Sequence, residues 1–523
     1  MLCEELVGDE ESIPPTSCHG DADWEVEGKY YCVMHAPTKN KRGSFKKALK
    51  YKLDARDYDF KGVWFFENVD LKGHDFEKDI DFSFAVFNGI ADFSAVQFSG
   101  MVKFNHAVFR GGNIYLNGAL FKENAEFRST EFHGRLSDFS NVSFNGKVTD
   151  FSYAKFVGGT AHFSDAQFVG NVEFYWTMFG YDADFLYTRF LKNAYFIRTL
   201  FLSNLSFAHA RFESAVSFNT LEFKAPAFAD FGQAFYKDSV QIIGLKIHKG
   251  VELCFSGAIF EKPQRVLFHS IPNLLPHWFV DLDTRTLNFE NTNFHLQKGS
   301  FISEELKNVK NSQRELPMIR SRREFRRVED HALQVKTVKF SEDPTPPSEL
   351  LITAYRRLAV NAEENNRYEQ AMNLRYIAMD IRRREKWWKR FLPITLYWWY
   401  WVSSGYGERA FRAGIMLFLI WLVPFMFYAS SLSAFSPKEA YRHIRAQDQK
   451  DGLFSKTNLT DSTPLPTIKD AAFYSLNVMA FQKPEPKPTD DSWPTRLIVT
   501  LQTILGPLQA TLFALAIRRK FMK

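Results

Sequence analysis

Four residues near the amino terminus are of types that bind zinc. They are Cys3, Cys18, Cys32 and His35. Thiolate and imidazole are zinc ligands, and a segment this short and polar would gain folding free energy from a bound metal. The sequence therefore predicts one structural zinc (Zn) site in residues 1–40. The cysteines are separated by 14 and 13 residues, more than in compact zinc ribbons, and His19 could replace a ligand, so free cytosolic thiols are the alternative.

The tripeptide Gly405-Tyr406-Gly407 has the letters with which potassium channels coordinate their ion. A selectivity filter needs a membrane span and a pore helix before it, and carbonyl oxygens aligned along the pore. In this chain, arginines and one short aromatic segment come before the tripeptide instead. The sequence therefore predicts a glycine turn here and not an ion filter.

Two segments are long and apolar enough to span a bilayer. Residues 413–435 and 497–517 are 23 and 21 residues long, and neither segment contains Asp, Glu, Lys or Arg. About 20 apolar residues are needed to cross the hydrocarbon. The sequence therefore predicts a multi-pass membrane protein that contacts the lipid bilayer.

Basic residues flank these segments unevenly. Residues 382–412 contain eight Lys or Arg and two acids, and residues 518–523 contain four Lys or Arg and no acid, whereas residues 436–495 contain eight of each. Cytoplasmic flanks are enriched in Lys and Arg, so both termini are expected in the cytoplasm. The acidic start of the chain, MLCEELVGDEES, lacks the basic and apolar regions of a secretory signal.

The second apolar segment carries the residues best suited to line a pore. Gln502, Gly506 and Gln509 are spaced by four and three residues, so they fall on one helix face. Polar residues at bilayer depth normally face a bundle interior or water, which predicts that this face lines a pore. Hydrogen bonding between helices without conduction is the alternative. Gly506 and Pro507 are together expected to kink the helix as a hinge.

Phenylalanine, which occurs 54 times, recurs with a period of 11 residues. From residue 163 to residue 223 it occupies twelve positions separated by alternate steps of five and six residues, as in NVEFYWTMFGY. A helix would need a step of 3.6 and a half-buried strand a step of two. The longer step indicates the corners of a solenoid whose interior is filled by the rings.

Units such as ADFSAVQFSGM resemble the pentapeptide-repeat family. That resemblance implies a right-handed quadrilateral β-helix over residues 55–262, with the central Phe stacked inside. Some members of the family mimic DNA with an acidic surface. Residues 81–200, however, hold ten Lys or Arg and eleven Asp or Glu, so no nucleic-acid mimicry and no nucleic-acid partner are expected. Similar heads with Cys and Y-C-x-x-H-x-P precede such repeats, which supports the zinc prediction.

The carboxyl-terminal region resembles the two-span ion-channel module, with AFYSLNVMAF as the pore helix between an outer and an inner helix. The resemblance implies a homotetramer, since two spans cannot enclose a pore alone. The expected pore-loop residues are Asn477, Gln482, Lys483 and Glu485. Where that family has T-x-G-Y-G-D, this chain has Q-K-P-E-P, a degenerate filter that does not favour potassium selectivity.

The predicted fold class is mixed, with a β-solenoid, a helical hairpin and an α-helical membrane module. Apolar residues at helical spacing on both sides of Asn365-Asn366 predict the hairpin. The aromatic segment FLPITLYWWYWVS, too short to span a bilayer, indicates a helix lying in the interface, with a soluble docking helix as the alternative. The predicted parts are the zinc head (1–40), the solenoid (55–262), an irregular linker (263–347), the hairpin (348–390), the interfacial helix and turn (391–410), and the two-span module (411–523).

The segment between solenoid and membrane shows no carboxylate pair, histidine dyad or phosphate-binding loop in a fitting context, so no enzyme is expected. We expect an oligomeric ion-channel-like protein of the bacterial inner membrane. Its cytosolic solenoid would sense or bind an unknown protein or ligand and gate the pore. A membrane-anchored interaction scaffold without conduction is the alternative.

Overall fold

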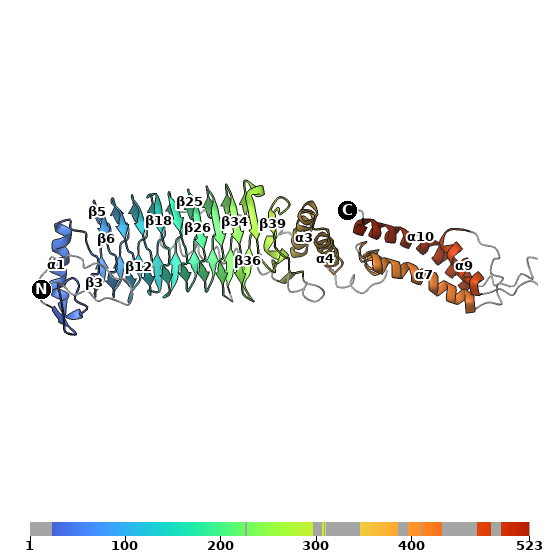
Figure 1. Ribbon diagram of the computed structural model, residues 1–523, viewed down its shortest axis with the longest axis horizontal. Helices are drawn as coiled ribbons and strands as arrows, with labels where there is room; N and C mark the ends of the chain where they lie inside the picture. The colour runs from blue at the N-terminus through green and yellow to red at the C-terminus, as the bar shows by residue number, and fades with distance from the viewer. Residues whose placement is uncertain are drawn as a thin grey trace, which may run out of the picture. The chain divides into compact units, whose positions relative to one another are not determined.

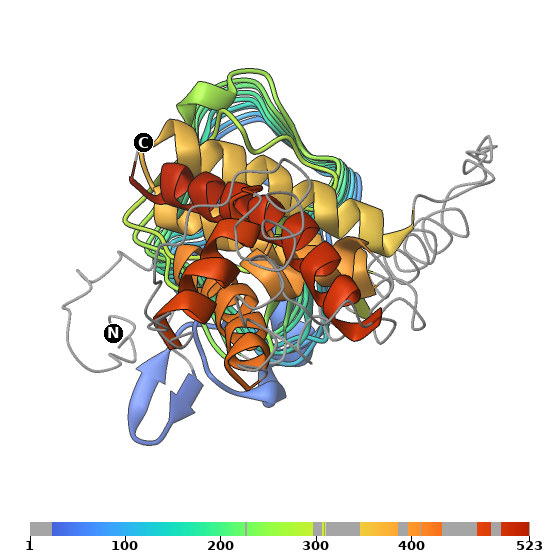
Figure 2. The same ribbon diagram turned by 90° about the vertical axis from the view of Figure 1, so that its right-hand side faces the viewer.

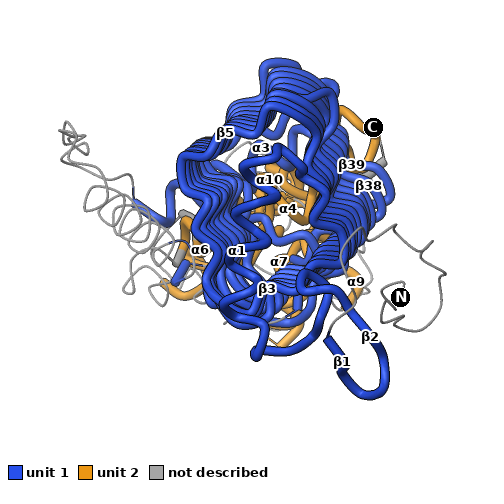
Figure 3. Tube along the Cα trace, turned by 90° about the vertical axis from the view of Figure 1, so that its left-hand side faces the viewer, with its two compact units in different colours: residues 1–361 blue, residues 362–523 orange. Residues whose placement is uncertain are grey.

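The computed structural model of the protein divides into two compact units, residues 1–361 and residues 362–523 (Figure 3). The structure describes residues 24–224, 227–296, 346–384, 396–407, 409–430, 468–482 and 493–521, together with residues 306, 307 and 309.

The first unit is a solenoid of short strands, of which most contain two to four residues (Figure 1). Four parallel sheets form its walls, with ten strands in one sheet and nine in each of the others, which makes about ten turns. The sheets run from β6 (Ile80–Asp81) to β39 (Asn288–Glu290), from β3 (Trp64–Phe65) to β35 (Lys246–Ile247), from β4 (Val69–Asp70) to β36 (Glu252–Cys254), and from β5 (Asp75–Phe76) to β37 (Ile259–Phe260). Seen from its end, successive turns overlie one another (Figure 2).

Phenylalanine rings fill the interior, as the period of 11 predicts. Phe163 lies 4.8 Å from Phe139 in the turn before and 4.8 Å from Phe185 in the turn after, each pair stacked. Within a turn the rings meet edge to face, as Phe151 and Phe163 do at 5.5 Å and 88°. Both arrangements suit the aromatic quadrupole. The Phe repeat is therefore a packing device.

The D-F-S part of the repeat builds the corners. The carboxylate of Asp150 accepts a hydrogen bond from the backbone N–H of Ser152 at 2.7 Å, and Asp81 does the same for Ser83 at 2.7 Å. The residue after that serine has a positive φ, as at Tyr153 with φ 61°. A short side chain that accepts from the backbone two residues later favours such a turn.

A small head precedes the solenoid. Strands β1 (Trp24–Val26) and β2 (Lys29–Tyr31) form an antiparallel hairpin, followed by the short helix η1 (Lys39–Lys41) and by α1 (Arg42–Asp54). Helix α1 covers the first turn through Phe45, whose ring packs edge to face on Phe65 at 5.5 Å. It thereby shields the open end of the Phe column from water.

The solenoid extends beyond residue 262, so the predicted linker begins too early. The short helices η2 (Pro263–Arg265) and η3 (Pro276–Phe279) interrupt the repeat, and β38 (Val266–His269) and β39 still join the first sheet. The rings of Phe268 and Phe289 continue the stack at 5.0 Å. The spacing widens here because these insertions lengthen the last turns, which is why the period fades in the sequence.

Helix α3 (Pro347–Glu364) is fixed to the last turn of the solenoid. The side-chain amide of Asn361, 1% exposed, donates to the backbone oxygens of Thr284, Arg285 and Leu287 at 3.0, 3.0 and 2.7 Å. These contacts satisfy carbonyl groups at the end of the solenoid, beyond the last strand of the described residues.

The second unit is helical, with α4 (Tyr368–Arg384), α6 (Leu396–Ser404), α7 (Ala410–Ser430), α9 (Ile468–Met479) and α10 (Trp493–Phe521). A turn at Asn366, with φ 59°, precedes α4. Arg375 of α4 forms an ion pair with Glu363 across this turn. The predicted helical segments are therefore present, and α4 is described as far as Arg384.

Candidate functional site: a short helix between two apolar helices

Helices α7 and α10 lie side by side and are long and apolar enough to cross a membrane (Figure 1 and Figure 2). Only 6% of the apolar stretch of α7 and 17% of that of α10 is buried within the chain. Large side chains such as Phe418 (53% exposed) and Ile504 (61% exposed) point outward. Such exposed apolar surface needs a cover of lipid or protein.

Helix α9 is too short to cross a membrane but packs on both long helices. Its 12 residues span about 18 Å, against about 30 Å of hydrocarbon. The ring of Tyr474 meets Tyr428 of α7 edge to face at 5.0 Å. At its carboxyl end, Met479 lies against Gly506, where an added Cβ would be 2.2 Å from the Met479 Cγ. Helix α9 therefore ends beside the middle of α10.

Gln502 holds α9 in this place. Its side-chain Nε2, in a residue 2% exposed, donates to the backbone oxygen and the Oγ of Ser475 at 2.9 and 2.7 Å. The Ser475 hydroxyl donates in turn to the Trp421 carbonyl of α7 at 2.9 Å. One amide thus joins three helices, because each polar group in this apolar setting needs a partner.

Gln509 holds the amino-terminal end of α7 in the same way. Its Nε2 donates to the backbone oxygens of Ser403 at 2.8 Å and Ala413 at 2.9 Å. Gln502, Gly506 and Gln509 therefore do share one face, as expected, and in the single chain that face contacts α6, α7 and α9. This geometry fits the alternative of hydrogen bonding between helices, and pore lining by these residues stays a prediction.

The face of α10 opposite to Gln502, Gly506 and Gln509 is exposed, and no prediction from the sequence concerned it. It carries Thr500 and Thr511, whose hydroxyls donate to carbonyls of the same helix, and the apolar Ile504 and Leu508. The signal that could have revealed it is the 11-residue spacing of the threonines, which is close to three helical turns. Pro507 lies inside α10, which is assigned as helix throughout its length, and its role as a hinge stays a prediction.

The predicted pore loop begins at a capped helix end. The Asn477 carbonyl accepts hydrogen bonds from the N–H groups of Ala480 at 3.1 Å and Gln482 at 2.9 Å, and Phe481 has φ 60°. A left-handed residue after the last helical turn is a usual way to end a helix. Gln482 is exposed. Lys483 and Glu485 lie outside the described residues.

The Gly405-Tyr406-Gly407 tripeptide forms a turn between α6 and α7, with φ values of 56°, 63° and 75°. Tyr406 is 2% exposed, and burial raises the pKa of its phenol, although the nearby Arg383 opposes this. The Arg383 guanidinium lies 4.4 Å above the Trp401 ring, and that of Arg412 lies 4.9 Å from the same ring. The predicted turn is confirmed, and the cation–π contacts of Trp401 fix the preceding helix α6 to α4 and α7.

Two of the four predicted zinc ligands lie together. The Cys32 Sγ is 3.1 Å from the His35 Nδ1, and the His35 Nε2 donates to the Lys61 carbonyl at 2.9 Å. A backbone carbonyl on the other ring nitrogen is what orients a metal-binding histidine, so the pair fits zinc. Cys3 and Cys18 lie outside the described residues. Among the residues that the structure describes, no three or more His, Cys, Asp or Glu side chains lie close enough to hold a metal ion. Zinc binding stays a prediction.

An exposed column of aromatic and basic side chains follows one corner of the solenoid. Tyr153 (44% exposed) and Trp176 (50% exposed) stack at 6.5 Å. Arg128 lies 5.3 Å from the Tyr153 ring, and Arg198 lies 4.5 Å from the Trp176 ring. Within the repeat, the predictions from the sequence considered only the phenylalanines and therefore missed this column. Exposed aromatic and Arg side chains are common at protein interfaces.

Comparison with known families decides the nature of the solenoid. Residues 85–131 and 127–175 match the model of pentapeptide repeats (9 copies). The chain contains pentapeptide repeats. No curated protein and no solved structure gave a significant match. The pentapeptide-repeat solenoid is thus confirmed by its sequence pattern and by its strands, and the ion-channel-like module stays a prediction.

Proposed function

We propose that this is an ion-channel-like membrane protein that works as a homo-oligomer, with four subunits as implied by the two-span resemblance. In this proposal α7 and α10 cross the bacterial inner membrane, and both termini and the solenoid are cytoplasmic. The observation that carries the proposal is the position of α9. It packs on both long helices and ends halfway along α10, next to Gly506.

The turn after α9 would then lie deep in the membrane. Ala480, Phe481 and Gln482 follow the end of α9 and do not continue its regular helix. Phe481 and Gln482 are exposed in the single chain. Irregular backbone at membrane depth is tolerated only where protein covers it or water fills a cavity beside it. A ring of subunits around a water-filled pore supplies both conditions, because neighbouring subunits cover this backbone on one side and water lies on the other. A helix that served only as a tether would not need such a re-entrant segment.

The pentapeptide-repeat solenoid supplies the binding function. Its column of Arg128, Tyr153, Trp176 and Arg198 offers a surface for an unknown protein or ligand. Binding would act on the pore through α4 and through the turn at Tyr406, whose ring lies 5.6 Å from the ring of Tyr376 in α4. The second candidate, a membrane-anchored scaffold without conduction, is favoured by the in-chain hydrogen bonds of Gln502 and Gln509.

Charge changes at Gln482 test the proposal. Full-length protein is reconstituted in planar bilayers, and the reversal potential is measured in asymmetric KCl. Gln482→Glu should raise the cation-to-anion permeability ratio and Gln482→Lys should lower it, each by roughly fivefold, the equivalent of about 1 kcal/mol of Coulomb energy. Gln241→Glu on the exposed solenoid surface is the control and should change nothing. A protein that localises and folds but never conducts supports the scaffold instead.

A further inference from the structure

Helix α1 presents a basic surface at the end of the solenoid. Residues 39–56 contain eight Lys or Arg and one Asp. Arg42 and Lys46 both pair with Glu67. Lys47 and Lys50 are exposed, and within the described part of the chain neither forms an ion pair. This surface therefore carries positive charge beyond what its acidic neighbours neutralise.

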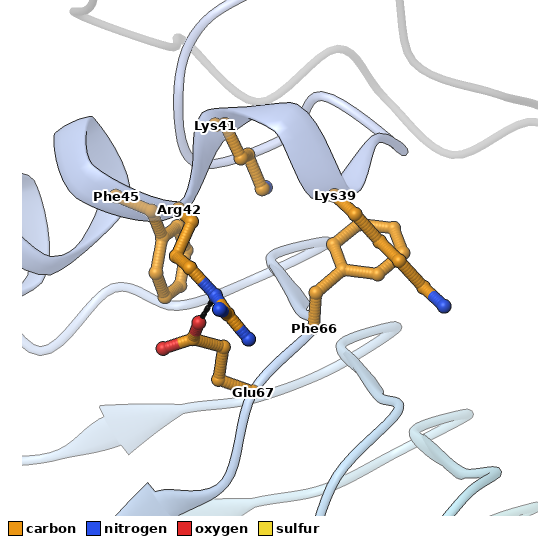
Figure 4. Close-up of a pocket in the computed structure, with 6 residues that line it drawn as sticks. All are labelled: Lys39, Lys41, Arg42, Phe45, Phe66 and Glu67. Atoms are coloured by element: carbon orange, nitrogen blue, oxygen red, sulfur yellow. Dashed lines mark ion pairs between the residues drawn. The ribbon is translucent and has the colours of Figure 1, made fainter.

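A pocket of about 370 Å³ opens beside this helix (Figure 4). Its walls are two phenylalanine rings, three basic side chains and one carboxylate, from Lys39, Lys41, Arg42, Phe45, Phe66 and Glu67. The Lys41 ammonium donates to the Met34 carbonyl at 2.7 Å and lies 4.7 Å from the Phe45 ring. Since Lys41 is 2% exposed, the fold itself places this charge in the wall. Such a pocket suits a carboxylate with some apolar surface.

The amino-terminal segment of the same chain has the matching charge. Residues 1–23 contain seven Asp or Glu and no Lys or Arg. Acidic and apolar residues alternate in its first part, MLCEELVGDEES. We propose that the α1 surface and its pocket bind this acidic segment, residues 1–23, of the same chain.

The connection makes this contact geometrically easy. Trp24, where the described chain begins, pairs with Tyr31 in the β1–β2 hairpin, and the turn that follows carries Met34, the partner of Lys41. The 13 residues from Glu11 to Asp23 can reach up to roughly 43 Å, whereas α1 is about 20 Å long. Tethering gives the segment a high local concentration, so it outcompetes free anions for the same surface.

Carbodiimide cross-linking of the full-length protein in detergent tests the proposal. This reagent joins carboxylates directly to amines, and mass spectrometry locates the links. A chelator is present, so that the result does not depend on the predicted zinc site. We expect links from Glu4, Glu5, Asp9, Glu10 or Glu11 to Lys39, Lys46, Lys47 or Lys50, and we expect them to disappear in 1 M salt, where the Debye length is about 3 Å.

Proteolysis gives an independent measurement. A Glu-specific protease should cleave after Glu10 and Glu11 slowly in the wild type and roughly 2- to 10-fold faster in Lys47→Gln/Lys50→Gln. The matched control is Lys192→Gln/Lys249→Gln, which removes two exposed lysines elsewhere on the solenoid. It should leave the rate unchanged.

Three results would overturn the proposal. In oligomers assembled from heavy-isotope-labelled and unlabelled chains, links found only between chains would assign the surface to a second copy. Absence of links, together with binding of the wild type but not of Lys47→Gln/Lys50→Gln to vesicles containing phosphatidylglycerol, would assign it to an anionic membrane. Equal cleavage rates in the wild type and in both variants would also contradict it.

Discussion

The solenoid and the helical unit place their polar and apolar side chains in opposite ways. In the solenoid, Phe163 and its neighbours are fully buried, and most charged side chains face outward. In the helical unit, Ile504 is 61% exposed, while the amides of Gln502 and Gln509 are 2% exposed. The first arrangement is stable in water, whereas the second leaves apolar surface that lipid or protein must cover.

The two units also differ in which groups form the hydrogen bonds between neighbouring elements. Each turn of the solenoid bonds to the next through backbone groups, as Phe163 N does to Asp184 O at 2.7 Å, so side chains are free to fill the interior. The helices satisfy their backbone internally, and side chains such as Gln502 must join one helix to another. Aromatic packing thus stabilises the first unit, whereas buried amides position the elements of the second.

The largest expected effect follows from opening the Phe column. Phe163→Ala removes a ring that stacks on both sides, and the cavity should cost about 3–5 kcal/mol. The measurement is thermal unfolding of the full-length protein followed by the β-sheet signal in circular dichroism. Tyr181→Ala, at a residue 53% exposed, is the control and should cost within about 0.5 kcal/mol. Equal losses in the two variants would contradict the inside-filled solenoid.

A smaller effect is expected from the buried amide of the helical unit. Gln502→Leu removes the bonds to Ser475 and should destabilise the unit by roughly 0.6–1.7 kcal/mol. Unfolding of the helical signal by SDS in mixed micelles measures this loss. Thr500→Val, which removes a bond within one helix only, should change little. If both variants behaved alike, Gln502 would not hold α9.

The smallest effect is a pH dependence of the solenoid. Burial raises the pKa of Glu252, but hydrogen bonds from His277 and Trp278, at 2.7 and 2.9 Å, outweigh it and leave the pKa below its usual value. A lowered carboxyl pKa stabilises the fold above the unfolded-state pKa, near 4.3, and this stability is lost as the pH falls through the lower folded value.

Stability curves of the wild type and Glu252→Gln measure this pH dependence. The wild type should be more stable at pH 7, and the difference should shrink below about pH 4. Helices α7, α9 and α10 do not include this cluster, so their unfolding in SDS serves as the internal reference. A difference that grew on acidification would show that the sign is wrong.

Local periodicity explains which features could be predicted. The five- and six-residue steps of Phe specify the solenoid because each ring must return to the same interior. The apolar runs and their lengths specify α7 and α10. The short turn at Gly405–Gly407 follows from glycine at positions with positive φ. The continuation of the solenoid to β39 was missed, since the insertions at η2 and η3 break the period.

The sequence predicted which polar residues form the candidate site, but not which residues they contact. Gln502 and Gln509 stand out in any sequence reading as polar residues in an apolar run, and the structure gives them partners 27 and 106 residues away in Ser475 and Ser403. Such pairings depend on how helices pack, and no local pattern encodes them. Tyr153 and Trp176, in contrast, come together because they occupy equivalent positions in successive turns of the solenoid.

The sequence by itself determined the kind of two parts: a solenoid filled by phenylalanine, and two long apolar helices. The tertiary structure alone decided where α9 ends, which groups the buried glutamines bind, and which aromatic rings remain outside the core. The physical reason is that periodicity and hydrophobicity act along the chain, whereas the partner of a buried polar group is chosen by the packing of distant segments.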